Sequence, residues 1–279
     1  MPTAQVNDIT INYVDAGQGE PLVLVHNIIA SVHAFDFNIP EFSKHYRTVA
    51  FDLRGHGLSS KPESESDYSF EILAEDLYQL LKQLDIDSCY LLGQAAVGVG
   101  AIFTFFLRHP EMVKALISVS GSTIAQVRST EAAARTQSQF DRIREAARTG
   151  GMMAALEERK SSMLFWIPKT LEDPAIYNRF EEMYRQTAVP AFLALPERFT
   201  EERRQAIIDH VASHLVPKML ILGSLDSAPQ EQVAGMRMVA PDLHAVMLPD
   251  CGHYPAIENP RDFNAAVLNF IAGAKLYQS

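Results

Sequence analysis

Short apolar runs typical of buried strands alternate along this chain with helical patterns. A strand-like alternation covers residues 4–15, and later apolar runs end at His26, Asp52, Leu92 and Ser120. Strands that alternate with helices are typical of a parallel sheet covered by helices on both faces. The chain is therefore predicted to fold as an α/β protein with a doubly wound, mostly parallel sheet.

Two helices of the core are predicted from local signals. Ser69 is a candidate N-cap for a helix that runs to Leu84, with leucine and isoleucine side chains along one face. A second, strongly apolar helix follows residues 93–98 and is expected to end before Pro110. These helices are expected to cover the predicted sheet.

The pattern changes between residues 123 and 214. This stretch has no strand-like run, carries many charges, and has helical patterns interrupted by Gly and Pro. We predict that 123–214 is an all-helical cap inserted after the sixth strand, within a core formed by 1–122 and 215–279. Charged runs at 157–160 and 201–204 are predicted to be solvated helix faces.

Four segments resemble the motifs of one known family and span nearly the whole chain. They are residues 23–26, 51–60, 218–226 and 246–255. With these four segments, the chain resembles a capped α/β hydrolase of the lactonase, esterase and carbon-carbon hydrolase group. The resemblance implies that Asp226 is the acid and His253 the histidine of the catalytic triad. Their order along the chain, after the nucleophile turn, is the one that this fold uses.

Two of these motif residues have alternative interpretations that need no catalysis. Asp226 also fits a helix N-cap before residues 227–229, and His253 also fits a loop histidine bonded to backbone. In the segment 51–60, Asp52 and Arg54 are expected to tie the loop together through charge-assisted hydrogen bonds. This segment is therefore interpreted as structural.

The nucleophile turn of the family normally reads Gly-x-Ser-x-Gly, but this chain has no nucleophile there. Ala95 occupies the serine position when Gly93 is the first glycine. In the frame shifted by one residue Ala96 occupies it and Gly98 is the second glycine. Neither frame supplies a hydroxyl, thiol or carboxylate, and Val97 replaces the second glycine in the first frame.

Three explanations for Ala95 remain open from the sequence. In the first, the serine of a hydrolase has been replaced, by an engineered Ser→Ala change or by natural divergence, and the chain is inactivated. In the second, the chain is a natural non-hydrolytic enzyme that needs no cofactor and uses His253 with Asp226 as a general base. In the third, the chain is a catalytically silent receptor for a small ligand.

The loop that supplies the oxyanion hole also departs from the family. His26 is followed by Asn27 where the family has glycine, so Asn27 needs either a positive φ or a changed loop. The resemblance implies that the backbone N–H groups of Ile28 and Ala96 are the oxyanion donors, since such donors do not depend on the side chain. Asn27 and Gln94 are also predicted to contact the ligand.

Aromatic side chains of the predicted cap indicate an apolar cleft. Phe165, Trp166 and Phe192 are the residues selected to line it, because ligands bind in a cleft of this kind in such folds. The predicted substrate is accordingly a small apolar ester, lactone or carbonyl compound that contains a ring.

Composition excludes several other functions. The net charge is −10 with no basic stripe, which argues against nucleic acid or an anionic membrane as a partner. Two cysteines, Cys89 and Cys251, are too few for a disulfide framework and predict free thiols in the cytoplasm. Cys251 as an alternative nucleophile is disfavoured, since no signature supports it. No signal peptide, metal-ligand spacing or cofactor motif is found, and a homo-oligomer stays open.

Overall fold

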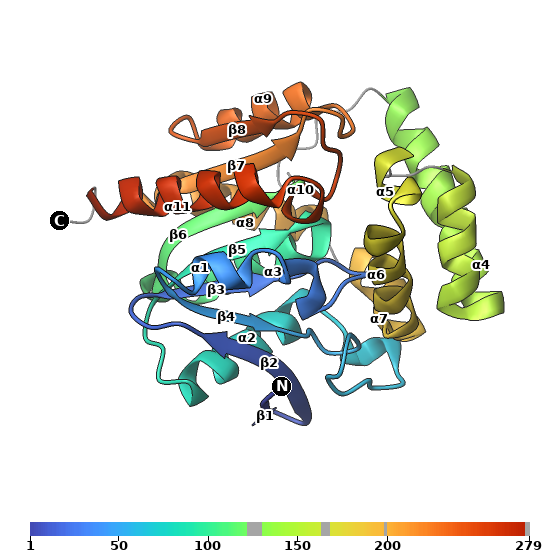
Figure 1. Cartoon of the computed structure of the whole chain (residues 1–279), viewed down its shortest axis with the longest axis horizontal. Coiled ribbons are helices and arrows are strands. Elements are labelled where there is room, and N and C mark those ends of the chain that lie inside the picture. Colours follow the sequence, from blue (N-terminus) through green and yellow to red (C-terminus); the bar gives the residue numbers. More distant parts are fainter. Residues whose placement is uncertain (122–129, 163–167, 198–199, 277–279) are drawn as a thin grey trace.

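One sheet organises the computed structural model, which describes residues 1–121, 130–162, 168–197 and 200–276. Its eight strands lie in the order β1-β2-β4-β3-β5-β6-β7-β8. β1 pairs with β2, and β2 with β4, in antiparallel fashion, whereas all other neighbours are parallel. The prediction of a mostly parallel α/β sheet is therefore confirmed (Figure 1).

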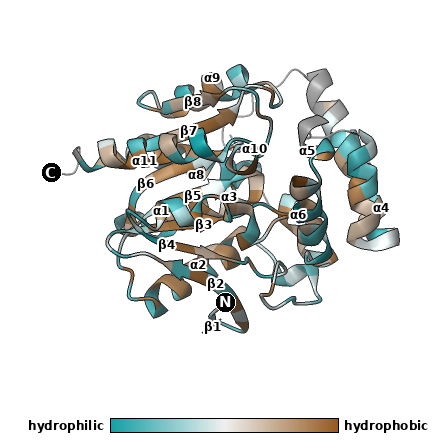
Figure 2. Ribbon diagram, viewed as in Figure 1, coloured by the Kyte–Doolittle hydropathy of each residue, from teal (hydrophilic) through white to brown (hydrophobic). Residues whose placement is uncertain are grey.

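The strands have the following bounds: β1 (Thr3–Val6), β2 (Ile9–Ala16), β3 (Pro21–Val25), β4 (Arg47–Phe51), β5 (Cys89–Gln94), β6 (Val113–Val119), β7 (Lys218–Gly223) and β8 (His244–Leu248). The inner strands β3, β5 and β7 are buried almost throughout, which explains why they form continuous apolar runs in the sequence. Figure 2 shows these apolar strands between helices whose outer faces are hydrophilic.

Helices cover both faces of the sheet. Helices α2 (Phe70–Gln83), α3 (Ala95–Arg108), α8 (Glu201–Ser213) and α9 (Pro229–Val239) contribute to one core cluster. Helices α1 (Ile39–Phe42), α10 (Pro255–Glu258) and α11 (Pro260–Leu276) contribute to the cluster on the other face. As predicted, Ser69 caps α2, where its hydroxyl accepts a hydrogen bond from the Ile72 N–H at 3.2 Å.

Between β6 and β7 the described residues form helices, which we call the helical segment. They are α4 (Thr130–Ser162), α5 (Pro168–Glu172), α6 (Pro174–Arg185), α7 (Val189–Glu197) and α8. In Figure 1, α4 to α7 lie beside the end of the sheet toward which β5 and β7 run. α8 instead packs on α3, where the His210 ring is 4.7 Å from the Phe106 ring. The predicted cap boundaries stay a prediction.

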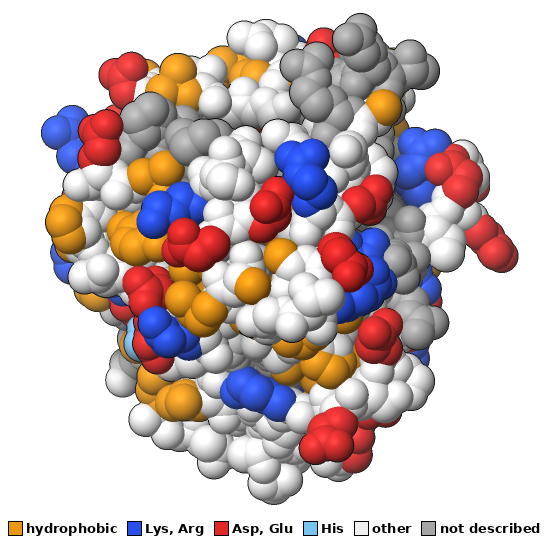
Figure 3. All heavy atoms as spheres, turned by 90° about the vertical axis from the view of Figure 1, so that its right-hand side faces the viewer, with side chains coloured by type: hydrophobic (Ala, Val, Ile, Leu, Met, Phe, Trp, Pro, Cys, Tyr) orange, Lys and Arg blue, Asp and Glu red, His pale blue; other side chains and the backbone are white. Residues whose placement is uncertain are grey.

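The outer face of the helical segment mixes charged and apolar side chains. Figure 3 shows basic and acidic groups interspersed there. The prediction that residues 157–160 form a solvated face is wrong for Arg159, which is only 6% exposed. Its guanidinium donates to the phenol oxygens of Tyr184, at 3.0 Å, and of Tyr254. One arginine within this run of charged residues therefore points into the protein and is not part of a solvated face.

Candidate active site

The turn between β5 and α3 has a strained backbone at one residue. Ala95 has a φ of 50°, in the left-handed region, while Ala96 is absent from the positive-φ residues. For a residue with a side chain this conformation costs about 1–2 kcal/mol. The left-handed position thus falls in the frame that starts at Gly93, and Ala95 is the residue at the corner between strand and helix.

Close packing around this turn explains which glycines it needs. A Cβ atom on Gly93 would lie 2.5 Å from the Gly98 carbonyl oxygen, and one on Gly98 would lie 2.5 Å from the Val25 carbonyl oxygen. Both distances are shorter than side chains tolerate. Val97, which departs from the family motif, is 1% exposed and packs in the core. The tight approach of helix to strand is therefore at Gly98 and leaves room for a side chain at Val97.

His253 and Asp226 meet as the sequence predicts. The His253 Nδ1 atom lies 3.1 Å from each Asp226 carboxylate oxygen, and the two side chains are 9% and 1% exposed. A carboxylate at Nδ1 favours the Nδ1–H tautomer and leaves Nε2 as the basic nitrogen. The N-cap alternative for Asp226 is wrong, because Ala228 is the N-cap of α9.

The loops that carry these two residues are packed tightly against each other. A Cβ atom on Gly223 would lie 2.1 Å from the Gly252 carbonyl oxygen. The Leu225 N–H donates to the Cys251 carbonyl oxygen at 3.0 Å, and the Ser224 N–H donates to the Leu248 carbonyl oxygen at 2.8 Å. Acid and histidine loops consequently form one unit at the ends of β7 and β8.

A buried carboxylate supports the histidine loop from α10. Glu258 is 5% exposed and accepts hydrogen bonds from the Gly252 N–H at 2.5 Å and the Thr170 hydroxyl at 2.6 Å. Burial raises the pKa of the Glu258 carboxyl, against the lowering effect of these two hydrogen bonds. Glu258 was not predicted from the sequence, and its spacing of five residues from His253 is the only local signal for it.

The loop after β3 forms a turn at the position of the expected oxyanion hole. The Ala30 N–H donates to the Asn27 carbonyl oxygen at 3.1 Å, so Ile28 and Ile29 are the central residues of this turn. Asn27 is not among the residues with positive φ, so the loop itself is changed. Asparagine is favoured at the first position of such turns, which explains how it replaces glycine here.

Both expected oxyanion donors have available N–H groups. Within the described part of the chain, no group accepts a hydrogen bond from the Ile28 N–H. Ala96 lies in the first turn of α3, where N–H groups have no acceptor within the helix. Gly98 packs against the carbonyl oxygens of Val25 and His26, which brings the start of the loop against the first turn of α3.

Of the residues predicted to contact the substrate, three are buried and two lie outside the described residues. Gln94 is 1% exposed, and neither its amide nitrogen nor its amide oxygen has a partner among the described residues. Asn27 is 5% exposed, and Phe192 on α7 is 4% exposed within the core cluster that α10 and α11 share. Phe165 and Trp166 lie outside the described residues.

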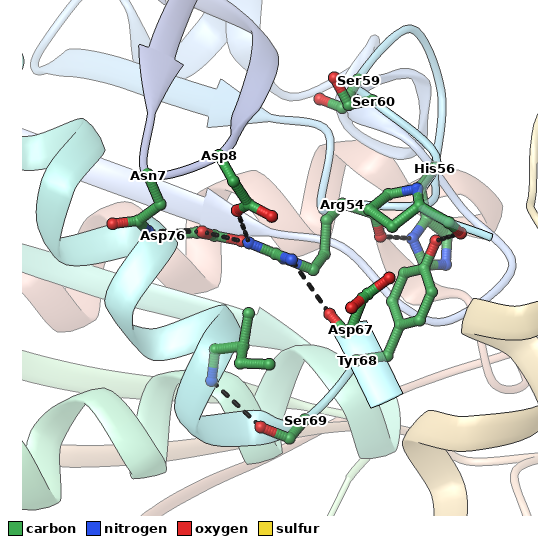
Figure 4. A network of polar contacts seen from close by, with 12 residues as sticks. Asn7, Asp8, Arg54, His56, Ser59, Ser60, Asp67, Tyr68, Ser69 and Asp76 are labelled. Atoms are coloured by element: carbon green, nitrogen blue, oxygen red, sulfur yellow. Dashed lines mark hydrogen bonds and ion pairs between the residues drawn. The ribbon is translucent and has the colours of Figure 1, made fainter. Parts of the chain in front are cut away.

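The predicted structural role of the segment 51–60 is supported by its contacts. Arg54 donates to both carboxylate oxygens of Asp76, at 2.6 and 2.8 Å, and lies 3.2 Å from Asp8 (Figure 4). The Asp52 carboxylate accepts from the N–H groups of Val32, at 2.8 Å, and Leu58, at 2.9 Å. The segment therefore anchors the loop after β3 to the sheet.

Both cysteines are buried, and neither forms a disulfide. Burial raises the pKa of Cys89 to about 12, which keeps that thiol protonated. Among the described residues there is no group of three or more His, Cys, Asp or Glu side chains placed to bind a metal ion. The same residues include no helix long and apolar enough to cross a bilayer.

The geometry agrees with comparisons to known proteins. The sequence model of the family described as "alpha/beta hydrolase fold" matches residues 20–260. The chain therefore belongs to the α/β hydrolase family, as its motifs predicted. Its structure is similar to that of a thermophilic esterase from Thermogutta terrifontis, with a TM-score of 0.81, 24% identity, and coverage of 95% of this chain and 94% of the esterase.

Other similar proteins have several different activities. The chain is 23% identical to 2-hydroxy-6-oxo-6-(2'-aminophenyl)hexa-2,4-dienoic acid hydrolase of Metapseudomonas resinovorans, over 95% of this chain and 88% of that enzyme. It is 40% identical to epoxide hydrolase 3 of Xenopus tropicalis, but over only 39% of this chain and 30% of that protein. An enol-lactonase from Burkholderia xenovorans has a TM-score of 0.77 at 21% identity, covering 97% of this chain and all of the lactonase. Such likenesses establish the fold and leave the substrate open.

Proposed function

We propose that this chain acts on a small apolar ester, lactone or carbonyl compound without forming an acyl-enzyme. The observation that carries the proposal is the buried His253–Asp226 pair, kept at 3.1 Å in a chain whose elbow residue, Ala95, ends in a methyl group. The helical segment would act as the cap over this site. The esterase and lactonase among the similar structures support the substrate class.

In the proposed chemistry, His253 is a general base. Its Nε2 atom takes a proton from an ionisable substrate, or from a water that then adds to the substrate carbonyl. The Asp226 carboxylate stabilises the imidazolium that forms. The N–H groups of Ile28 and Ala96 stabilise the substrate oxyanion, and His253 later returns the proton to the product or leaving group.

The test of this base is His253→Ala, measured against His244→Ala as the control on an exposed histidine of β8. We expect turnover of short aryl esters and lactones to fall by about 10²–10⁴-fold in the first variant, the usual contribution of general-base catalysis, and to be unchanged in the second. Equal rates for His253→Ala and the unaltered chain would contradict the proposal.

A second candidate, an inactivated hydrolase, is favoured by the strained backbone that Ala95 keeps. Its φ of 50° is the strained conformation that exposes a nucleophile at this corner in the family's motif, and Ala95 retains it. Ala95→Ser should then raise aryl-ester turnover by several orders of magnitude, since loss of such a serine costs about 10⁶ in kcat. A Ser variant that is no faster rejects this candidate. Tight ligand binding with no turnover by either form would instead indicate a receptor.

A further inference from the structure

Two buried histidines outside the acid–base pair contact the oxyanion-hole loop. His26 and His56 are both 0% exposed, and their rings pack edge to face with centroids 5.1 Å apart. Burial lowers the pKa of His26 well below 6.5, an effect that the neighbouring His56 reinforces, and burial also lowers the pKa of His56. These shifts favour the neutral form of both imidazoles, in which each ring has a single N–H to donate.

The tautomer of His26 follows from its partners. Its Nε2 atom accepts a hydrogen bond from the Leu53 N–H at 2.9 Å, so the proton must be on Nδ1. Nδ1 lies 2.6 Å from the Asn27 carbonyl oxygen, to which it donates. One neutral tautomer satisfies both contacts, and it fixes the direction of the Asn27 carbonyl.

His56 makes a matching contact one residue further along the loop. Its Nε2 atom lies 2.6 Å from the Ile28 carbonyl oxygen, and its Nδ1 atom lies 2.9 Å from the Arg54 carbonyl oxygen. A neutral ring can donate to only one of them. A bare ring nitrogen that faces a carbonyl oxygen brings two lone pairs together, and their repulsion is stronger at the shorter distance. The proton is therefore placed on Nε2, which faces the Ile28 carbonyl oxygen.

These two contacts determine how Ile28 presents its backbone. In a trans peptide the N–H points opposite to the carbonyl of the preceding residue, and no cis peptide is present among the described residues. Because His26 holds the Asn27 carbonyl, the Ile28 N–H must point away from the buried imidazole. Because His56 holds the Ile28 carbonyl, the next peptide plane is fixed as well.

We propose that His26 and His56 are positioning residues that clamp the two peptides flanking Ile28 and so hold the Ile28 N–H in place as an oxyanion donor. The inference rests on the proposed function for its catalytic meaning. It gives that site a preorganised donor, the form of electrostatic stabilisation that needs no rearrangement when charge develops. It also assigns a role to His56. The other contacts of its segment, 51–60, only stabilise a loop.

The first test needs neither activity nor a variant. Long-range ¹H–¹⁵N correlation spectra of the ¹⁵N-labelled chain at pH 7 report which ring nitrogen of each histidine carries the proton. We expect a neutral Nδ1–H form for His26 and a neutral Nε2–H form for His56. A proton on Nδ1 of His56, with Nε2 bare, would overturn the clamp whatever the chain catalyses.

The second test asks whether the clamp matters for turnover. His56→Phe keeps the ring shape without a donor, His56→Gln keeps an N–H donor, and Tyr68→Phe is the control. Tyr68 belongs to the same region and donates to the Pro62 carbonyl oxygen at 2.6 Å, whereas among the described residues it makes no hydrogen bond to the loop at Ile28. All three are compared in whichever form turns over, the unaltered chain or Ala95→Ser.

We expect His56→Phe to lower kcat by roughly 10–10²-fold at nearly constant KM, below the 10²–10³ lost with a whole oxyanion donor. His56→Gln should recover part of this loss, and Tyr68→Phe should stay near the parent rate. Equal kcat in the three variants would contradict the catalytic role of the clamp. If neither parent turns over, the proposed function fails. The tautomers, and faster amide exchange of Ile29 in His56→Phe than in His56→Gln, still decide the clamp.

Discussion

At the scale of single residues, Ala95 and its glycine neighbours form a tight turn from strand to helix that contains no nucleophilic side chain. The backbone of Ala95 is left-handed, and Gly93 and Gly98 allow α3 to approach the ends of β3 and β5. None of these features depends on a hydroxyl. The turn is therefore a property of packing between helix and strand, and the chemistry at residue 95 is added to it.

The requirement for glycine at residue 98 can be tested directly. Gly98→Ala should destabilise the chain by about 1–3 kcal/mol, because its Cβ would lie 2.5 Å from the Val25 carbonyl oxygen. Gly273→Ala in α11 is the matched control, since a Cβ there meets nothing within 4 Å. It should stabilise by about 0.5–1 kcal/mol through helix propensity. Denaturant unfolding measures the change in unfolding free energy for both variants. If both variants are stabilised or both are destabilised, the packing argument is contradicted.

At the scale of elements, local patterns predicted the parts of the fold that depend on periodicity. The strands ending near His26, Asp52 and Leu92, and the helix capped by Ser69, all form as expected, because apolar spacing and caps are local signals. The family resemblance pointed to Asp226 and His253, which lie in the loops that follow β7 and β8. Sequence patterns place such residues at the ends of neighbouring parallel strands, where they meet.

Other parts of the site depend on contacts that local patterns do not record. Glu258 reaches Thr170 across 88 positions, and His56 reaches Ile28 across 28. The buried orientation of Arg159 likewise depends on tyrosines from α6 and from the histidine loop. These roles follow from the tertiary arrangement, so a pattern of residue types in one segment cannot reveal them.

The Glu20 carboxylate, directly before β3, contacts lysines on β6 and α11. These contacts predict that the stability of the chain depends on pH. Partial burial raises the pKa of Glu20, but the ammonium groups of Lys114 on β6 and Lys275 on α11 outweigh it and lower that pKa from 4.5 to about 2. A lowered carboxyl pKa gives stability that is present above pH 4.5 and is lost as the pH falls toward 2.

The experiment compares the unfolding free energy of the unaltered chain and of Glu20→Gln between pH 7 and pH 2. We expect the unaltered chain to be the more stable above about pH 5 and the difference to disappear on acidification. Glu63→Gln, on an exposed side chain, controls for the loss of one charge. A Glu20→Gln difference that is constant with pH would show that the two lysines do not set this ionisation.

At the scale of the whole molecule, the helical segment is joined to the sheet core by buried polar contacts next to the histidine loop. Thr170 on α5 donates to Glu258 on α10, and Arg159 on α4 donates to Tyr254, the residue after His253. Arg179 on α6 also forms an ion pair with Asp36, which lies between β3 and β4. The position of the helical segment and the geometry of the histidine loop are consequently linked.

Thr170→Val should reveal this link. Valine has nearly the same shape, so the change removes only the hydrogen bond to the buried Glu258 and should cost about 1–3 kcal/mol of unfolding free energy. Thr187→Val is the control, because that hydroxyl bonds to the Met183 carbonyl oxygen inside the helical segment. We also expect faster hydrogen exchange of the Gly252 amide in Thr170→Val alone. Unchanged exchange there would indicate that the helical segment and the histidine loop are independent.

The mutual packing of the acid and histidine loops has a consequence for how this chain can change over time. Asp226 and His253 are held by each other and by contacts from β7, β8 and α10. The corner at residue 95 is built separately, from glycines in β5 and α3. Two independently supported halves can be altered one at a time, so a single base change at codon 95 is enough to add a hydroxyl group to this corner while the contacts of the acid and histidine loops stay as they are.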